Sequence, residues 1–120
     1  MATHDDSTQD SRLRSQMRVY YGQSQDAILT GFSVDLSTGG LFLTTSFPLD
    51  VDEKLSLIFS LPDSDRSISC KARVAWTNPE HDPRKPELPP GVGVQFVDMS
   101  LEDMKSLKLF LERNVIEPTW

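Results

Sequence analysis

Two short motifs hold the side chains of this chain whose chemistry is best defined, and the first is a pair of arginines. Arg14 and Arg18 are separated by three residues. A guanidinium presents a rigid set of donors that fits phosphate oxygens or the O6 and N7 atoms of guanine, and its plane can stack on a base. Solvated surface arginines are the commoner case for an isolated pair. The spacing nevertheless makes both residues candidates for binding an anionic ligand.

The second motif spans residues 35–40 and reads Asp-Leu-Ser-Thr-Gly-Gly. Asp35 can accept hydrogen bonds from the N–H groups of guanine or orient an arginine, and Ser37 places a hydroxyl at a turn. Gly39 and Gly40 allow the backbone to approach a ligand closely or to adopt positive φ. Aspartate and serine also bond to their own backbone in many turns of this composition. Taken together, the two motifs predict a site for a guanine-bearing diphosphate ligand.

The other reactive side chains do not form a catalytic or metal-binding pattern. Cys70 is the sole cysteine of the sequence, His4 lies in a polar N-terminal segment and His81 lies in a proline-rich stretch. Neither the ligand spacing of a zinc site nor a nucleophile–base pair is present. We therefore expect a binding protein rather than an enzyme, with no metal and no cofactor.

The distribution of charge narrows the class of ligand. The 120 residues include 12 Lys and Arg against 18 Asp and Glu, which gives a formal net charge of −6. Residues 12–18 contain three arginines, whereas residues 1–11 contain three aspartates. An acidic protein lacks the basic surface that nucleic-acid polymers and anionic membranes require. The short basic segment instead suits a small dianion.

Length and hydropathy predict one folded unit. We expect residues 1–11 to form a disordered acidic leader, residues 12–116 to form the folded domain and residues 117–120 to form a tail. The N-terminal segment is polar and unlike a signal peptide, and no stretch approaches the ~20 apolar residues that span a bilayer. We therefore expect a cytoplasmic protein without membrane insertion.

The apolar pattern predicts an all-β domain with one helix. Alternating apolar residues predict six strands, over residues 19–21, 27–34, 41–44, 55–61, 68–76 and 91–97. The period then changes, and apolar residues at helical spacing predict an amphipathic helix over about residues 101–113, begun by Ser100 and Asp103 as a capping box. Short strands at nearly regular spacing are typical of a six-stranded antiparallel β-barrel, with the helix C-terminal to it.

The segment around Trp76 combines an aromatic residue with a proline-rich loop. Five of the eight prolines lie in residues 77–90, so this stretch is expected to leave the sheet as an extended loop. Trp76 is in phase with Val74, which favours a place in the core. The alternative is that Trp76 stacks on a guanine at the mouth of the barrel.

In their order along the chain, the two motifs resemble those of the PilZ domain, the bacterial receptor module for cyclic di-GMP. That family is marked by RxxxR followed by (D/N)xSxxG. Arg14 and Arg18 match the first pattern, and Asp35, Ser37 and Gly40 match the second. The resemblance covers residues 12–114 and implies a six-stranded antiparallel barrel with a C-terminal helix.

The spacing of the motifs leaves two assignments of the arginines open. Arg18 precedes Asp35 by 17 residues, which is shorter than in typical PilZ domains, whereas Arg12 precedes it by 23. If Arg12 takes the second arginine position, Thr8 falls on the first and the pair is broken. Arg14 and Arg18 then belong to the first strand rather than to the binding arm.

The resemblance implies a receptor that relays the level of cyclic di-GMP to a protein partner controlling motility, type IV pili or exopolysaccharide. Its ligand-binding residues are then Arg14, Arg18, Asp35, Ser37 and Gly40, with Arg12, Gly39 and Trp76 as further candidates. The alternative is a degenerate PilZ-like adaptor that binds no nucleotide. Such an adaptor would act through protein contacts of the loop 77–90, the acidic leader or the helix.

Overall fold

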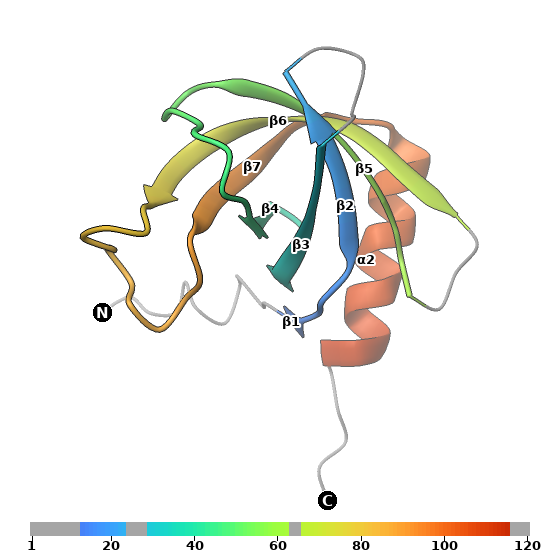
Figure 1. Cartoon of the computed structure of the whole chain (residues 1–120). Helices are drawn as coiled ribbons and strands as arrows, with labels where there is room; N and C mark the ends of the chain where they lie inside the picture. The colour runs from blue at the N-terminus through green and yellow to red at the C-terminus, as the bar shows by residue number, and fades with distance from the viewer. Residues whose placement is uncertain (1–12, 24–28, 63–65, 116–120) are drawn as a thin grey trace, which may run out of the picture.

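The computed structural model describes residues 13–23, 29–62 and 66–115, in which seven strand segments are followed by one helix (Figure 1). The predicted leader and tail lie outside these ranges. The elements are β1 (Leu13–Arg14), β2 (Arg18–Gly22), β3 (Leu29–Leu36), β4 (Gly40–Thr44), β5 (Lys54–Ser60), β6 (Ser67–Asn78), β7 (Gly91–Met99) and α2 (Leu101–Val115).

The segments form one antiparallel sheet that closes on itself. The strand order is β1-β3-β2-β5-β6-β7-β4, and a further pairing of β3 with β4 completes the ring. Both β1 and β2 pair with β3, so they are two parts of one barrel strand. Buried Ser33 bridges the interruption, because its Oγ accepts a hydrogen bond from Met17 N at 3.0 Å. The predicted six-stranded antiparallel barrel is therefore confirmed.

The strand alternation places one face of each strand in the barrel interior. Leu55, Leu57 and Phe59 of β5 are each at most 2% exposed. In β6, Ile68, Cys70, Ala72 and Val74 are buried. Burial of each large apolar side chain stabilises the fold by about 1.5–3 kcal/mol. The face of each strand that carries the alternating apolar residues is therefore the face that forms the core.

Trp76 departs from this alternation, and its predicted place in the core is wrong. The pairing of β6 with β7 shifts register between Val74 and Trp76, because Val74 pairs with Val94 and Trp76 pairs with Gly93. This bulge shifts the inward phase of β6 by one residue, so Trp76 no longer follows Val74 into the core. Trp76 is only partly buried, and its indole lies over Gly93, where a Cβ would collide with it.

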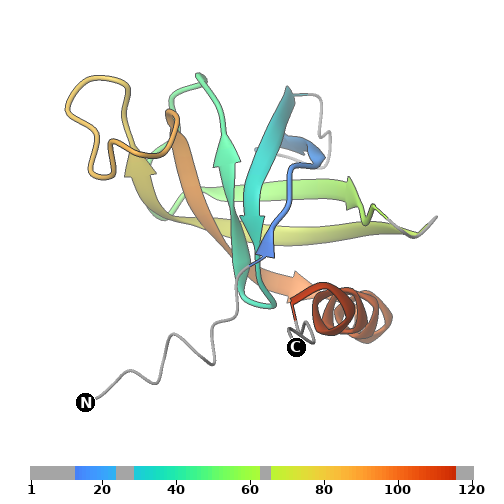
Figure 2. The same cartoon turned by 90° about the horizontal axis from the view of Figure 1, so that it is seen from below.

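Helix α2 packs against the end of the barrel opposite the proline-rich loop (Figures 1 and 2). Leu107, Phe110 and Leu111 face the core and are at most 5% exposed. The helix extends two residues beyond the predicted end at 113. No helix in the described part of the chain has the length and apolar content needed to cross a bilayer.

One of the two hydrogen bonds of the predicted capping box is present at the start of α2. The backbone N–H of Asp103 donates to Ser100 Oγ at 3.1 Å. The Asp103 carboxylate instead accepts hydrogen bonds from Arg66 Nε at 2.9 Å and from Ser69 N at 3.3 Å. The predicted acid therefore joins the helix to the beginning of β6.

The proline-rich segment is shorter and more ordered than the sequence predicts. Thr77 and Asn78 remain in β6, paired with Val92 and Gly91, so the loop consists of residues 79–90. It projects from the barrel (Figure 2). The buried side chain of Asn78 donates to the carbonyl oxygens of Lys85, Leu88 and Pro89 at 3.1–3.3 Å. The loop is therefore folded around one buried amide rather than extended.

Candidate functional site

An open cavity of about 370 Å³ lies on the outer wall of the barrel, between the turn that follows β3 and the loop 79–90. Asp35, Ser37, Gly39 and Trp76 are the predicted site residues that line it within the described part of the chain. Phe42, Lys85 and Gln95 line it as well. The second motif and Trp76, which are far apart in the sequence, therefore meet at one place.

Asp35 stands at a bulge that turns its carboxylate toward this cavity. The pairing of β3 with β4 shifts register between Ser33 and Asp35. One carboxylate oxygen, Oδ1, accepts a hydrogen bond from Phe42 N at 3.1 Å. This bond fixes the orientation of a partly buried acceptor at the rim of the cavity.

Ser37 organises the turn between β3 and β4. Ser37 is 1% exposed. Its hydroxyl accepts hydrogen bonds from the N–H groups of Gly39 and Gly40 at 3.1 and 3.2 Å and lies 3.3 Å from the Gly40 carbonyl oxygen. The Ser37 N–H donates to the same carbonyl at 2.9 Å. Ser37 therefore shapes the backbone of the site, since these contacts use the bonding capacity of one hydroxyl.

The two glycines of the motif have different surroundings. A Cβ at Gly40 would collide with the carbonyl oxygen of Val94, so the close approach of β4 to β7 requires glycine there. A Cβ at Gly39 would enter nearly open space. Neither glycine has positive φ. The sequence predicts either a close approach or positive φ at these glycines. Gly40 is needed for a close approach, but the group that approaches it is the neighbouring strand β7 rather than a ligand.

Trp76 forms the aromatic wall of the cavity. The centroid of its ring lies 5.4 Å from the centroid of the Phe42 ring, with an interplanar angle of 40°. On the side of the loop, Arg84 Cζ and Lys85 Nζ lie 5.5 and 5.6 Å from the indole centroid. Phe42 is 3% exposed although it stands outside the barrel core. The two rings therefore make a small apolar layer on the outer wall.

The predicted arginine pair is divided between two places. Arg14 in β1 is exposed and pairs directly with Asp35, so the two side chains project from the same face of the sheet with Cβ atoms about 5 Å apart. Arg18 in β2 has its Cζ 5.8 Å from the ring of Phe32 and lines a different cavity. Arg12 and Thr8 lie outside the described residues. The structure thus brings Arg14, and not Arg18, next to Asp35.

The basic residues of the loop were not among the site residues predicted from the sequence. Arg84 and Lys85 are consecutive and lie between Pro83 and Pro86, and this basic pair can be recognised in the sequence. The sequence does not show that the loop folds back around Asn78 and brings both cations to Trp76. Gln95 was missed as well, and its Oε1 accepts a hydrogen bond from Arg73 at 2.7 Å.

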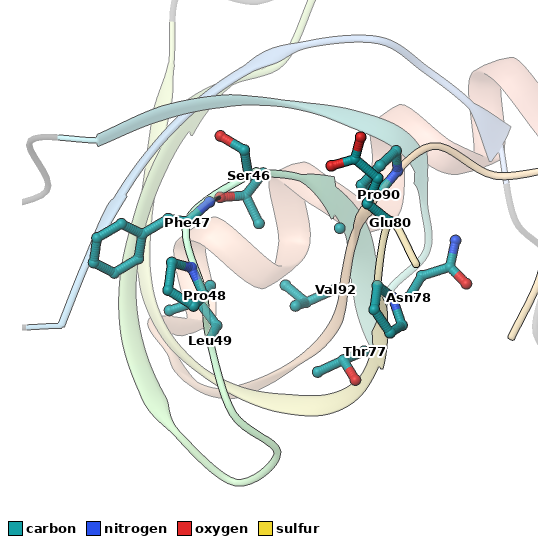
Figure 3. A pocket seen from close by; sticks show the side chains of 12 residues that line it. Ser46, Phe47, Pro48, Leu49, Thr77, Asn78, Glu80, Pro90 and Val92 are labelled. Atoms are coloured by element: carbon teal, nitrogen blue, oxygen red, sulfur yellow. Dashed lines mark hydrogen bonds between the residues drawn. The ribbon is translucent and has the colours of Figure 1, made fainter. Parts of the chain in front are cut away.

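A second cavity, of about 250 Å³, opens at the mouth of the barrel (Figure 3). Leu49, Thr77 and Val92 point into it, whereas the ring of Phe47 points away. Glu80 is the charged residue among those that line it. The cavity beside Trp76 is lined by the cation of Lys85 as well as by Asp35, whereas the described residues that line the mouth offer an anionic ligand no cation.

The buried thiol of Cys70 is not a nucleophile. Burial raises its pKa to about 12, and the charges of Asp103 and Asp98 act in the same direction. A thiol with this pKa remains protonated at neutral pH and is unreactive. Among the described residues, no group of three or more His, Cys, Asp or Glu side chains could hold a metal ion.

Comparison with known proteins gives one family match and several similar structures. Residues 8–113 match the family model of the PilZ domain. The Bacillus subtilis inhibitor of motility MotI/DgrA is similar with a TM-score of 0.70 and 18% sequence identity over 94% of this chain and 52% of its own. This chain thus spans about half the length of that protein.

A second solved structure, the PilZ domain of CeSA from a cellulose-synthesizing bacterium, gives a TM-score of 0.53 at 18% identity. The similarity covers 86% of this chain and 93% of that one. No curated protein sequence matches this chain. At this level of identity, the similar structures support the fold.

Proposed function

Because this chain belongs to the PilZ domain family, we propose that it is a receptor for cyclic di-GMP that relays the level of this messenger to a protein partner. One observation carries the proposal. Asp35, the turn of residues 37–40 and Trp76 meet at a single open cavity, and Arg14 stands beside it. These are the groups that a ligand with guanine bases and phosphates requires.

Each group has a chemical role in this proposal. The Asp35 carboxylate accepts hydrogen bonds from guanine N–H groups, and Ser37 with Gly40 holds the turn that presents it. Gly39 leaves open space at the rim. Trp76 offers a face on which a base can stack, a contact worth about 1–3 kcal/mol.

In this proposal, arginines bind the phosphates. Arg14 is adjacent to Asp35, and Arg12 directly precedes β1, so we assign both to the phosphates and the guanine edge. Arg18 is left out of this site, because its guanidinium lies over Phe32 and lines another cavity.

The output passes through another protein, since the family consists of receptor and adaptor domains. Motility, pili and exopolysaccharide synthesis are the processes we expect the partner to control. One similar structure is an inhibitor of motility and another is a PilZ domain from a cellulose-synthesizing bacterium. A receptor of this kind acts in the cytoplasm.

The separation of Arg18 from Asp35 supports a second candidate function. Within the described residues, one of the two arginines of the predicted motif stands beside the cavity and the other does not. A PilZ adaptor that binds no nucleotide and regulates its partner through protein contacts would tolerate this arrangement.

Titration calorimetry with cyclic di-GMP on the intact chain separates the two functions. We expect saturable binding, weakened at least about tenfold by Asp35→Ala and by Arg14→Ala, because each removes a charge-assisted hydrogen bond. Arg18→Ala is the matched control and should change the dissociation constant by less than about twofold, as expected for a charge outside the site. Absence of heat from the unaltered chain at high ligand concentration would reject the receptor in favour of the adaptor.

A further inference from the structure

The loop 79–90 brings two positive charges to the aromatic wall of the cavity. Arg84 and Lys85 are both exposed, and each places its cationic group within 6 Å of the Trp76 ring centroid, at 5.5 and 5.6 Å. Lys85 also lines the cavity that contains Asp35. Neither the sequence motifs nor the family assignment gives these cations a role.

The backbone of Lys85 is the best-anchored point of the loop. Its N–H donates to Asn78 Oδ1 at 2.8 Å, and its carbonyl accepts hydrogen bonds from Asn78 Nδ2 at 3.1 Å and Leu88 N at 3.0 Å. Asn78 is itself 1% exposed. The side chains at positions 84 and 85 therefore leave from a fixed stretch of backbone, directed at the indole.

The position of Trp76 is fixed from its other side. Gly93 lies under the indole, where a Cβ would collide with it, and the ring of Phe42 stands 5.4 Å away. The aromatic platform is thus held in place, while the two cations above it sit on long flexible side chains. A ligand that offers both a base and phosphates could take the platform and the cations together.

We propose that the loop 79–90 completes the nucleotide site, with a guanine on Trp76 and with Arg84 and Lys85 joining Arg14 in binding the phosphates. This inference rests on the proposed function. A phosphate forms charge-assisted hydrogen bonds with these cations, which are stronger contacts than those with an aromatic face. Binding therefore transfers Arg84 and Lys85 from the indole to the ligand and rearranges the surface of the loop that a protein partner can contact.

The first test is calorimetry with cyclic di-GMP on the intact chain and on the double variant Arg84→Ala/Lys85→Ala. The double variant should weaken binding at least about tenfold, and its affinity should depend less steeply on salt concentration. Lys105→Ala/Lys108→Ala is the matched control, because it also removes two exposed cations but from α2. Its dissociation constant should stay within about twofold of the unaltered chain.

The outcomes distinguish this inference from the function beneath it. If the unaltered chain does not bind, the proposed function and the inference both fail. If the unaltered chain binds and the loop variant binds equally well, the inference fails and the receptor stands. A loss shared equally by the loop variant and the α2 variant would indicate a general effect of net charge and would also overturn the inference.

A second test needs no nucleotide. In a Trp120→Phe background, Trp76 is the remaining tryptophan, and its fluorescence reports how well the loop covers the ring. Acrylamide is the suitable quencher because it is neutral and is not attracted by the cations. Arg84→Ala/Lys85→Ala should raise the quenching constant, whereas Lys105→Ala/Lys108→Ala should not. An unchanged constant in the loop variant would show that these side chains do not cover Trp76 and would overturn the inference.

Discussion

At one end of the barrel, α2 covers the core with apolar side chains, whereas toward the other end the loop 79–90 is held by a single buried amide. Leu107, Phe110 and Leu111 are each at most 5% exposed. The loop depends instead on the hydrogen bonds of Asn78. Apolar burial is strong and non-directional, whereas each hydrogen bond contributes about 0.5–1.5 kcal/mol net. The helix region therefore carries stability, and the loop region can rearrange at a smaller cost.

The two regions also use their cations differently. Near the helix, Arg66 binds the carboxylates of Asp103 and Glu102, and these bonds raise the pKa of its guanidinium. At the loop, Arg84 and Lys85 stand over the indole of Trp76. An aromatic ring attracts a cation without neutralising its charge. The positive charges of Arg84 and Lys85 therefore remain effective toward an anionic ligand, whereas the charge of Arg66 is balanced by its structural partners.

The largest expected effect is at the helix. Leu107→Ala removes a side chain that is 0% exposed and should lower the free energy of unfolding by about 2–5 kcal/mol, measured by urea denaturation. Leu109→Ala on the same helix is the control, because Leu109 is 53% exposed and its loss should change the free energy by less than about 0.5 kcal/mol. Equal effects of the two variants would contradict the assignment of the stabilising face.

A smaller effect is expected from the loop. Asn78→Ala should lower the free energy of unfolding by about 1–3 kcal/mol, because it leaves groups of the loop without their partner. Hydrogen exchange should show the difference locally, with faster exchange of the Lys85 amide, which donates to Asn78 Oδ1. His81→Ala, an exposed position in the same loop, is the control. A loss of stability as large as that of Leu107→Ala would show that the loop is part of the main folding unit.

Most of the fold could be predicted because it depends on local periodicity. Alternating apolar residues in β5 and β6 predict strands, and residues at helical spacing predict α2, since each face must be buried. The position of Trp76 outside the core could not be predicted in this way. The bulge that turns it away from the core depends on the pairing of β6 with β7, and a non-local register shift leaves no mark on the alternation within one strand.

The candidate site could be predicted in part for the same reason. Asp35, Ser37 and Gly40 form a local turn, so their spacing was enough to find them. Arg14 and Arg18 share a short motif, yet the pairing of their strands sends one toward Asp35 and the other toward Phe32. Lys85 reaches the site through the buried amide of Asn78, a contact across the loop that residue types and spacing do not encode.

The most direct measurement of the central claim is an amide and indole NMR titration of the intact, isotopically labelled chain with cyclic di-GMP. The account predicts saturable shifts at Asp35, Gly39 and Lys85 and at the indole N–H of Trp76, with the amides of α2 unchanged. Shifts concentrated on α2, or no shifts at high ligand concentration, would contradict a nucleotide site between the turn after β3 and the loop 79–90.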